Sequence, residues 1–156
     1  MKIAVGSDER TQLTSTVIED LQKRGHTLTL FGPISEAESR DADWPLTSGQ
    51  TAEAVAHGDA DEGIVFCWTG TGASIAANKI AGARAALCHD AETARGARKW
   101  NHANVLAISL RTTSEAIAKE ILDAWFETPF SDDEWNLQQI DRIRELEERN
   151  GLKVKS

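Results

Sequence analysis

Hydrophobic and polar positions follow two periods along this chain, one typical of buried strands and the other typical of amphipathic helices. Short apolar runs predict strands at residues 2–6, 26–31, 63–68, 83–88 and 105–109. Apolar residues at helical spacing predict helices at 11–24, 48–57, 91–99 and 114–126, with a further helix after residue 68. The run at 63–68 is uninterrupted, which is typical of a strand buried on both faces of a parallel sheet.

Strands that alternate with helices at this cadence predict right-handed crossover units. We therefore expect an α/β fold, a three-layer doubly wound parallel sheet of the Rossmann-like type, over residues 1–131. With 156 residues and a hydrophobic content of 40 %, the chain is long enough for one substantial core. We expect residues 132–156 to form a C-terminal helical arm that is part of the same single domain.

The arm has a pattern of its own, an apolar stripe on a heavily charged helix. The stripe consists of Trp135, Leu137, Ile140, Ile143, Leu146 and Leu152. Two interpretations stay open, because such a helix can lie on the surface of its own domain or pack on a second subunit.

An acidic loop is expected at residues 32–45, and it is long enough to suggest a functional role.

The net charge, the lengths of the apolar runs and the positions of the cysteines narrow the classes of partner and the cellular location that we expect. A net charge of -8 argues against a protein that grips a nucleic-acid backbone. The chain has no run of about 18 apolar residues that would span a membrane, and its first residues lack the apolar core of a secretory signal. Cys67 and Cys88 lie in strand-like runs and not at the spacings of disulfides or zinc sites. We expect a cytoplasmic protein without a metal.

The segment CWTGTGASIAANK, residues 67–79, is the part of the sequence most suggestive of chemistry. It follows the buried strand, so Cys67 is expected at the carboxyl edge of the sheet, where ligands bind in doubly wound folds. Gly70 and Gly72 allow the backbone to approach a ligand, and the amides of the next helix favour an anion or a thiolate. A plain strand-to-helix connector is the alternative. The segment matches neither a phosphate-binding loop nor a dinucleotide fingerprint, so no nucleotide cofactor is expected.

Several blocks together resemble the ribose-5-phosphate isomerase B and galactose-6-phosphate isomerase family. The blocks are KIAVGSD, DWP, GDADEGIVFCWTGTGASIAANKIAGARAALCHD and NHANVLAISLR, which extend over nearly the whole chain. The resemblance implies an aldose–ketose isomerase that needs no cofactor and passes through an enediolate. It also implies a homodimer or homotetramer with active sites shared across the subunit boundary, acting on a small sugar or sugar phosphate.

The resemblance also implies roles for particular residues. The implied catalytic residues are Cys67, as the base that transfers the proton, with Thr69, Asp8 and Asn101. The implied substrate-binding residues are Gly70, Thr71, Gly72 and Ala73 of the anion-hole segment, and Arg111 as a phosphate contact. Cys88 is expected to be a packing residue of the core, as free cysteines usually are.

Four further candidate substrate contacts stand where the chain departs from the family pattern. Glu9 and Trp100 replace histidines, and Trp68 replaces a glycine; the histidine at the position of Trp100 is the one credited with opening the sugar ring. His102, two residues further on, is a candidate to replace that histidine in ring opening, although a histidine at a helix end is more often a surface residue. Glu134, within an acidic stretch, stands where the family has a phosphate-binding cation. The tryptophans line a sugar site or fill a remodelled subunit interface.

The C-terminal departures bear on the substrate. The family has two phosphate-binding arginines in this region, whereas this chain has Glu134 at the first position and Gln138 or Gln139 near the second. A hydrogen bond to a charged group contributes roughly 1.5 to 3 kcal/mol, so the loss of both arginines costs about 3 to 6 kcal/mol, a factor of roughly 10² to 10⁴ in affinity. We therefore expect an isomerase of a sugar, sugar acid or sugar phosphate other than ribose 5-phosphate. The alternatives are a genuine ribose-5-phosphate isomerase and, from another class, a catalytically weak sugar-binding or scaffold protein.

Overall fold

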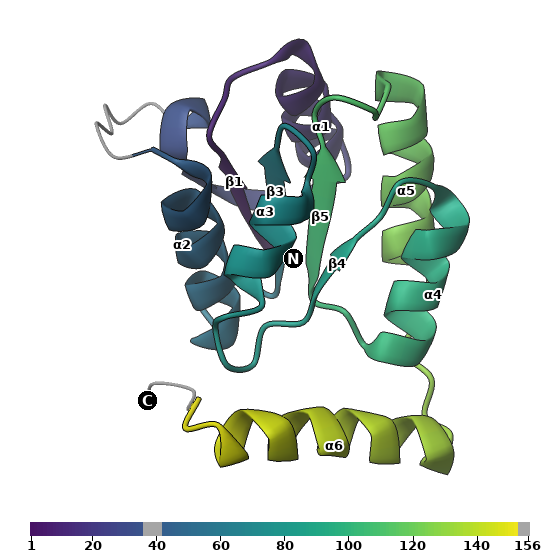
Figure 1. The fold of residues 1–156 in the computed structure, drawn as a ribbon. Coiled ribbons are helices and arrows are strands. Elements are labelled where there is room, and N and C mark those ends of the chain that lie inside the picture. The colour runs from purple at the N-terminus through teal and green to yellow at the C-terminus, as the bar shows by residue number, and fades with distance from the viewer. Residues whose placement is uncertain (36–41, 153–156) are drawn as a thin grey trace.

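The computed structural model describes residues 1–35 and 42–152, and it has a five-stranded parallel sheet in the order β2-β1-β3-β5-β4 (Figure 1). The strands are β1 (Lys2–Ser7), β2 (Thr27–Phe31), β3 (Glu62–Cys67), β4 (Ala85–Leu87) and β5 (Val105–Ser109). The order reverses between β1 and β3, so the carboxyl ends of these two strands flank the crevice in which a doubly wound sheet binds its ligand.

Helices cover both faces of the sheet, which confirms the predicted three-layer architecture (Figure 1). One face carries α1 (Gln12–Lys23), α4 (Ala91–Asn101) and α5 (Glu115–Glu127), and the other carries α2 (Trp44–Ala56) and α3 (Thr71–Ala77). A separate helix, α6 (Glu134–Arg149), follows α5. Ser114 caps α5 as the sequence indicates, because its hydroxyl accepts a hydrogen bond from the backbone N–H of Ile117.

The alternation of side chains along β3 decides on which face the site lies. Ile64 and Phe66 belong to the larger core under α1, α4 and α5, whereas Val65 and Cys67 belong to the smaller core under α2 and α3. All six residues of β3 are buried, in agreement with the uninterrupted apolar run. The period of two therefore directs the Cys67 side chain toward α3, the helix that begins just after it.

The start of α2 differs from the predicted boundary. The helix begins at Trp44 and not at residue 48, because Asp43 caps it through Leu46 N (3.2 Å) and Pro45 lies in its first turn, where its missing N–H costs nothing. The expected loop at 32–45 is accordingly shorter, and it begins with the 3₁₀ helix η1 (Gly32–Ile34). The rest of the expected loop, residues 36–41, lies outside the described residues.

Helix α6 lies across the amino ends of the strands, as Figure 1 shows. Asn136 and Ile140 are buried against the domain, and the carboxylate of Glu147 accepts a hydrogen bond from Gly82 N (3.1 Å), just ahead of β4. The helix therefore lies on its own domain, while Trp135 and Leu146 on it stay exposed. Residues 153–156 of the expected arm are outside the described residues. No helix in the described ranges is long and apolar enough to cross a membrane.

A buried ion pair holds the chain that leads to α6. Glu62 at the start of β3 pairs with Arg98 of α4 (2.7 Å) and accepts a hydrogen bond from the Trp125 indole of α5. The Arg98 guanidinium lies between the rings of Trp125 and Phe130, 4.9 and 4.3 Å from their centroids. Burial raises the pKa of Glu62, and Arg98 and Trp125 oppose that rise. This cluster ties β3, α4 and α5 to the segment before α6.

Candidate active site

A small pocket lies at the carboxyl ends of β1 and β3. Its volume is about 280 Å³, and it is lined by Asp8, Trp44, Cys67, Trp68, Thr69, Thr71 and Gly72. These residues come from the ends of two strands and the first turns of α2 and α3. The pocket is at the lower edge of the roughly 300 to 1,000 Å³ range of small-molecule sites, which suits a single small substrate.

Cys67 supplies the nucleophilic atom of the pocket. It is the last residue of β3 and is 5 % exposed, and its thiol is free. The backbone N–H of Ala73, in the first turn of α3, donates to Cys67 Sγ at 3.4 Å. A donor in this position stabilises negative charge on sulfur, so the geometry suits a thiol that takes up and returns a proton.

The loop between β3 and α3 is held in one conformation by its glycine and by β5. Gly70 has φ +74°, and a Cβ there would lie 2.5 Å from Leu87 Cδ1 and 3.0 Å from the backbone of Ile108. Only glycine fits this position. The loop is also bonded to the chain after β5, since Leu110 N donates to Cys67 O (3.0 Å) and Arg111 N donates to Trp68 O (2.9 Å). The amides that follow Cys67 are therefore preorganised.

The hydroxyls of Thr69 and Thr71 lie 2.6 Å apart at the mouth of this loop. Both side chains line the pocket, and both residues are exposed. Two hydroxyls at this separation can accept and donate in turn, so they offer adjustable hydrogen bonds to the oxygens of a polyol.

Asp8 is the acidic group of the pocket. Desolvation by burial raises the pKa of its carboxyl, its own backbone N–H opposes that rise, and the charges of Glu9 and Asp43 add to it. The Oδ1 atom is withdrawn from solvent and accepts no hydrogen bond from another residue in the described ranges. Glu9 is exposed beside it, with its backbone N–H bonded to Ser7 Oγ (3.2 Å). A carboxyl with spare acceptor capacity is suited to a substrate hydroxyl.

Trp44 lines the pocket although the sequence analysis did not single it out. In the sequence it belongs to the DWP block that contributes to the family resemblance, within the loop expected at residues 32–45. Its ring packs on Gly72, where a Cβ would lie 2.9 Å from Trp44 Cε3. The signal that could have found it is the Asp-Trp-Pro pattern itself, which is typical of a helix N-terminus.

Three of the candidate residues lie away from this pocket in the same chain. Asn101 ends α4 a few residues before β5, and residues that precede parallel strands lie at the amino edge of the sheet. Trp100 is its neighbour, and Glu134 begins α6, whose approach is held by the hydrogen bond from Ser131 N to Lys99 O (2.9 Å). The Arg111 side chain is exposed near the rim but does not line the pocket.

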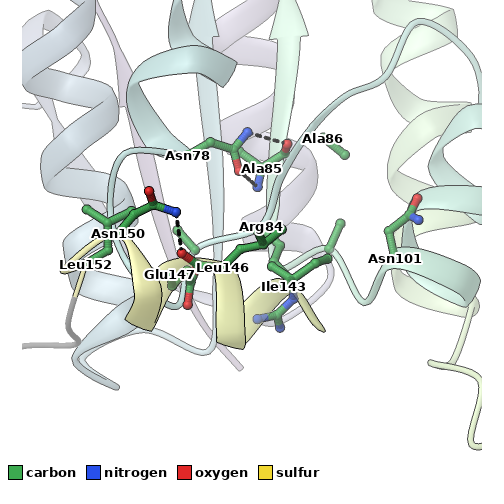
Figure 2. Close-up of a pocket in the computed structure, with 12 residues that line it drawn as sticks. Asn78, Arg84, Ala85, Ala86, Asn101, Ile143, Leu146, Glu147, Asn150 and Leu152 are labelled. Carbon is green, nitrogen blue, oxygen red and sulfur yellow. Dashed lines mark hydrogen bonds between the residues drawn. The ribbon is translucent and has the colours of Figure 1, made fainter. Parts of the chain in front are cut away.

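Asn101 instead lines a larger hollow of about 500 Å³ between the start of β4 and α6. Figure 2 shows Asn101 at the end of α4, with Arg84 and Ile143 between it and Leu146. A neighbouring hollow of about 570 Å³ shares Arg84 and Glu147. Both exceed the Cys67 pocket in volume, but the described residues of their walls include no thiol or hydroxyl nucleophile. Chemistry therefore favours the smaller pocket.

The surroundings of Cys88 and His102 test two expectations from the sequence. Cys88 is a core residue as expected, 1 % exposed, and burial raises the pKa of its thiol to about 12. The expectation that His102 is a surface residue is wrong. Its ring stacks on Phe130 with centroids 4.5 Å apart, and its Nε2 lies 2.8 Å from Ser131 O. This packing holds the segment before α6 and leaves His102 outside the Cys67 pocket.

Within residues 1–35 and 42–152, no group of three or more His, Cys, Asp or Glu side chains is arranged to hold a metal ion. The groups that the pocket does offer are a thiol with an amide donor, a carboxyl and two hydroxyls. Such a set can move a proton between neighbouring carbons of a sugar and stabilise the oxyanion that forms.

Comparisons with known proteins agree with this chemistry. The sequence model described as "Ribose/Galactose Isomerase" matches residues 3–143. A ribose-5-P isomerase B of Listeria innocua is 34 % identical over 151 residues, which cover 96 % of this chain and 99 % of that protein. A D-erythrulose-4-phosphate isomerase of Pectobacterium atrosepticum is 37 % identical over 131 residues, covering 83 % of this chain and 85 % of that one.

A solved structure extends the agreement to the fold. The ribose-5-phosphate isomerase B of Clostridium thermocellum superposes with a TM-score of 0.87 at 36 % sequence identity, over 96 % of this chain and 99 % of that chain. The chain therefore belongs to the ribose/galactose isomerase family and is an aldose–ketose sugar isomerase.

Proposed function

We propose that this isomerase acts on an uncharged sugar and not on ribose 5-phosphate, with Cys67 as the base. One observation carries the proposal: none of the described residues that line the Cys67 pocket is an arginine or a lysine. The charged residues at the pocket are instead acidic, since Asp8 lines it and the charges of Glu9 and Asp43 act on Asp8. A phosphate dianion placed there would be repelled.

The reaction follows from the positions of the groups. Cys67 Sγ removes the proton from the carbon next to the carbonyl. The oxygen that becomes negative is held by the N–H groups of Thr71 and Gly72 at the start of α3, because Gly70 N donates to Cys67 O and Ala73 N donates to Cys67 Sγ. One donor of this kind contributes typically 2.7 to about 4 kcal/mol to transition-state stabilisation, so these amides supply much of the acceleration. The proton then returns from sulfur to the neighbouring carbon. Asp8 and the two threonine hydroxyls orient the substrate.

A second candidate function is a genuine ribose-5-phosphate isomerase, and one observation favours it. Arg111 is fixed beside the pocket through the hydrogen bond from its backbone N–H to Trp68 O, and its exposed side chain is a cation at the rim. The relatives act on sugars of different length, as the names ribose-5-P isomerase and D-erythrulose-4-phosphate isomerase state. This breadth supports a family in which the reacting carbons are constant and the far end of the substrate varies.

The test compares phosphorylated and unphosphorylated sugars with the same reacting carbons. We expect kcat/KM for D-ribose or a matched neutral aldose to exceed kcat/KM for ribose 5-phosphate. Arg111→Ala is the matched variant, because it removes the cation at the rim. If ribose 5-phosphate is the better substrate by a factor of about 10² or more, and Arg111→Ala removes that advantage, the second candidate function is the correct one.

We also propose that a second copy of the chain completes the site. Asn101, Trp100 and Glu134 lie at the amino edge of the sheet, away from Cys67 of their own chain, and Asn101 borders an open hollow there. Exposed apolar side chains nearby, Trp135 and Leu137 on α6, are suited to a subunit contact.

Mixing two inactive variants tests this arrangement. Cys67→Ala and Asn101→Ala are each expected to be inactive. When subunits are exchanged, one site of each mixed dimer regains both side chains, so about a quarter of the wild-type activity is expected in an equal mixture. An exchanged mixture that stays inactive would show that Asn101 acts within its own chain or not at all.

A further inference from the structure

We infer that Trp44 and Trp68 form the two walls that select the substrate, and that they favour a neutral sugar with a C–H face and a small apolar end. This inference rests on the proposed function, since it concerns the same pocket. Its central residue is Trp44, which neither the sequence pattern nor the comparisons assign to the site.

Trp44 is held firmly at the edge of the pocket. It is the first residue of α2, a helix whose start is fixed by the Asp43 cap and by Pro45. A Cβ on Gly72 would lie between 2.9 and 3.2 Å from three atoms of the Trp44 ring, so the indole rests directly on the backbone of α3. Even so, Trp44 is 41 % exposed. One part of the ring is fixed by the protein, and the rest is available to a ligand.

Trp68 provides the second wall from a different element. It directly follows Cys67 in the loop before α3 and is 55 % exposed. Its backbone is fixed on the β5 side, because its carbonyl accepts hydrogen bonds from Ser109 Oγ (3.0 Å) and Arg111 N (2.9 Å). The fixed backbone holds Trp68 at the edge of the pocket, where its exposed indole is available for contact with a ligand.

The chemistry of the pocket makes the two walls selective. Indole faces carry a negative quadrupole and bury apolar C–H groups well, and exposed apolar surface gains roughly 25 cal/mol for each Å² that a ligand covers. Asp8 lines the same pocket as Trp44, and the charges of Glu9 and of Asp43, the residue before Trp44, act on Asp8. The negative faces and the carboxylates both disfavour a phosphate. A sugar that ends in a methyl group gains from the walls and avoids the repulsion.

The experiment uses three probes with the same reacting carbons: 5-deoxy-D-ribose, D-ribose and ribose 5-phosphate. For the full-length enzyme we expect 5-deoxy-D-ribose to have the highest kcat/KM of the three. Trp44→Ala should raise KM for 5-deoxy-D-ribose by about tenfold with kcat changed less than about threefold, and Trp44→Phe should restore most of the loss. Leu46→Ala is the control, because Leu46 is 47 % exposed on the same helix and does not line the pocket.

Binding without turnover separates this inference from the proposed function. Tryptophan fluorescence of the Cys67→Ala variant is titrated with 5-deoxy-D-ribose, with and without Trp44→Ala. Saturable quenching that disappears with Trp44→Ala supports the walls even if no neutral sugar is turned over. Unchanged KM and unchanged quenching in Trp44→Ala would overturn the inference, as would a loss confined to kcat, because the indole would then only position the loop.

Discussion

The two cysteines lie in surroundings that give them different chemistry. Cys67 borders a pocket and accepts a hydrogen bond from the amide of Ala73, whereas Cys88 is enclosed in the larger core. Burial and the charge of Asp90 raise the pKa of Cys88 to about 12, so this thiol stays protonated throughout the neutral range. Cys67 is thus placed for reaction, whereas Cys88 contributes to the packing of the core.

Cys67→Ala is expected to abolish isomerisation with little change in folding, because it removes the base and a side chain at the edge of the smaller core. Cys88→Ala is expected to keep the activity and to lower the free energy of unfolding by about 1 kcal/mol. Kinetics and denaturant unfolding of both variants check this. Similar losses of activity in both variants, with both folded, would contradict the assignment of the base.

At the scale of elements, the conformation of the loop from β3 to α3 depends on the positive φ of Gly70 and on the packing of this glycine against Leu87 and β5. Gly70 has φ +74°, and its Cβ position is occupied by Leu87 and β5. Gly58 has a similar φ of +79°, but a Cβ there meets nothing within 4 Å. The two glycines therefore separate the cost of the left-handed backbone from the cost of a clash.

Gly70→Ala is expected to be clearly more damaging than Gly58→Ala. In both variants the left-handed conformation lowers the free energy of unfolding by roughly 1 to 2 kcal/mol. Only Gly70→Ala also forces the amide loop away from Cys67. Thermal unfolding and kcat of the two variants provide the measurement. Equal effects on kcat would mean that the loop conformation is not needed for the reaction.

The buried pair of Glu62 and Arg98 is a second element-scale feature. Glu62→Gln leaves Arg98 buried without a counter-charge, so a loss of about 3 kcal/mol in the free energy of unfolding is expected. The double variant Glu62→Gln with Arg98→Met should recover part of that loss, since it removes the uncompensated charge. Denaturant unfolding measures both. A double variant less stable than the single one would show that the ring contacts of Arg98 dominate.

Part of this site could be predicted from the sequence, because some of its features depend only on residues that are neighbours along the chain. The apolar run of β3 and the glycines after it indicate the strand, the turn and the position of Cys67. The Asp-Trp-Pro pattern indicates that Trp44 begins a helix, but its contact with Gly72 depends on how α2 packs on α3, which this pattern does not report. The packing of His102 depends likewise on tertiary structure, because the ring that stacks on it, Phe130, is distant in the sequence.

At the scale of the whole molecule, the candidate residues divide between two ends of the sheet. Asp8, Cys67 and the loop after β3 follow the carboxyl ends of β1 and β3, while Asn101 precedes β5 at the amino edge. Helix α6 lies at that amino edge (Figure 1). A complete site in this family member therefore requires either a second copy or chemistry carried by the carboxyl edge alone. Helix α6, with Trp135 66 % exposed, is the element we expect to make the subunit contact.

Truncation before Asp132 tests the role of α6. We expect light scattering to give fewer copies per particle than for the full chain, because the exposed apolar side chains of α6 are lost. Circular dichroism of the truncated chain checks that the sheet domain still folds. The same number of copies per particle, in a folded truncated chain, would remove α6 from the proposed assembly.

The most direct test of the account is incorporation of deuterium from solvent into a neutral aldose, such as 5-deoxy-D-ribose, followed by NMR at the carbon next to the carbonyl. The wild-type enzyme is expected to exchange this hydrogen as it forms the ketose, and Cys67→Ala is expected to do neither, because the thiol carries the proton. Exchange at the wild-type rate in the folded Cys67→Ala variant would contradict Cys67 as the base. Exchange with ribose 5-phosphate alone would contradict the proposed substrate.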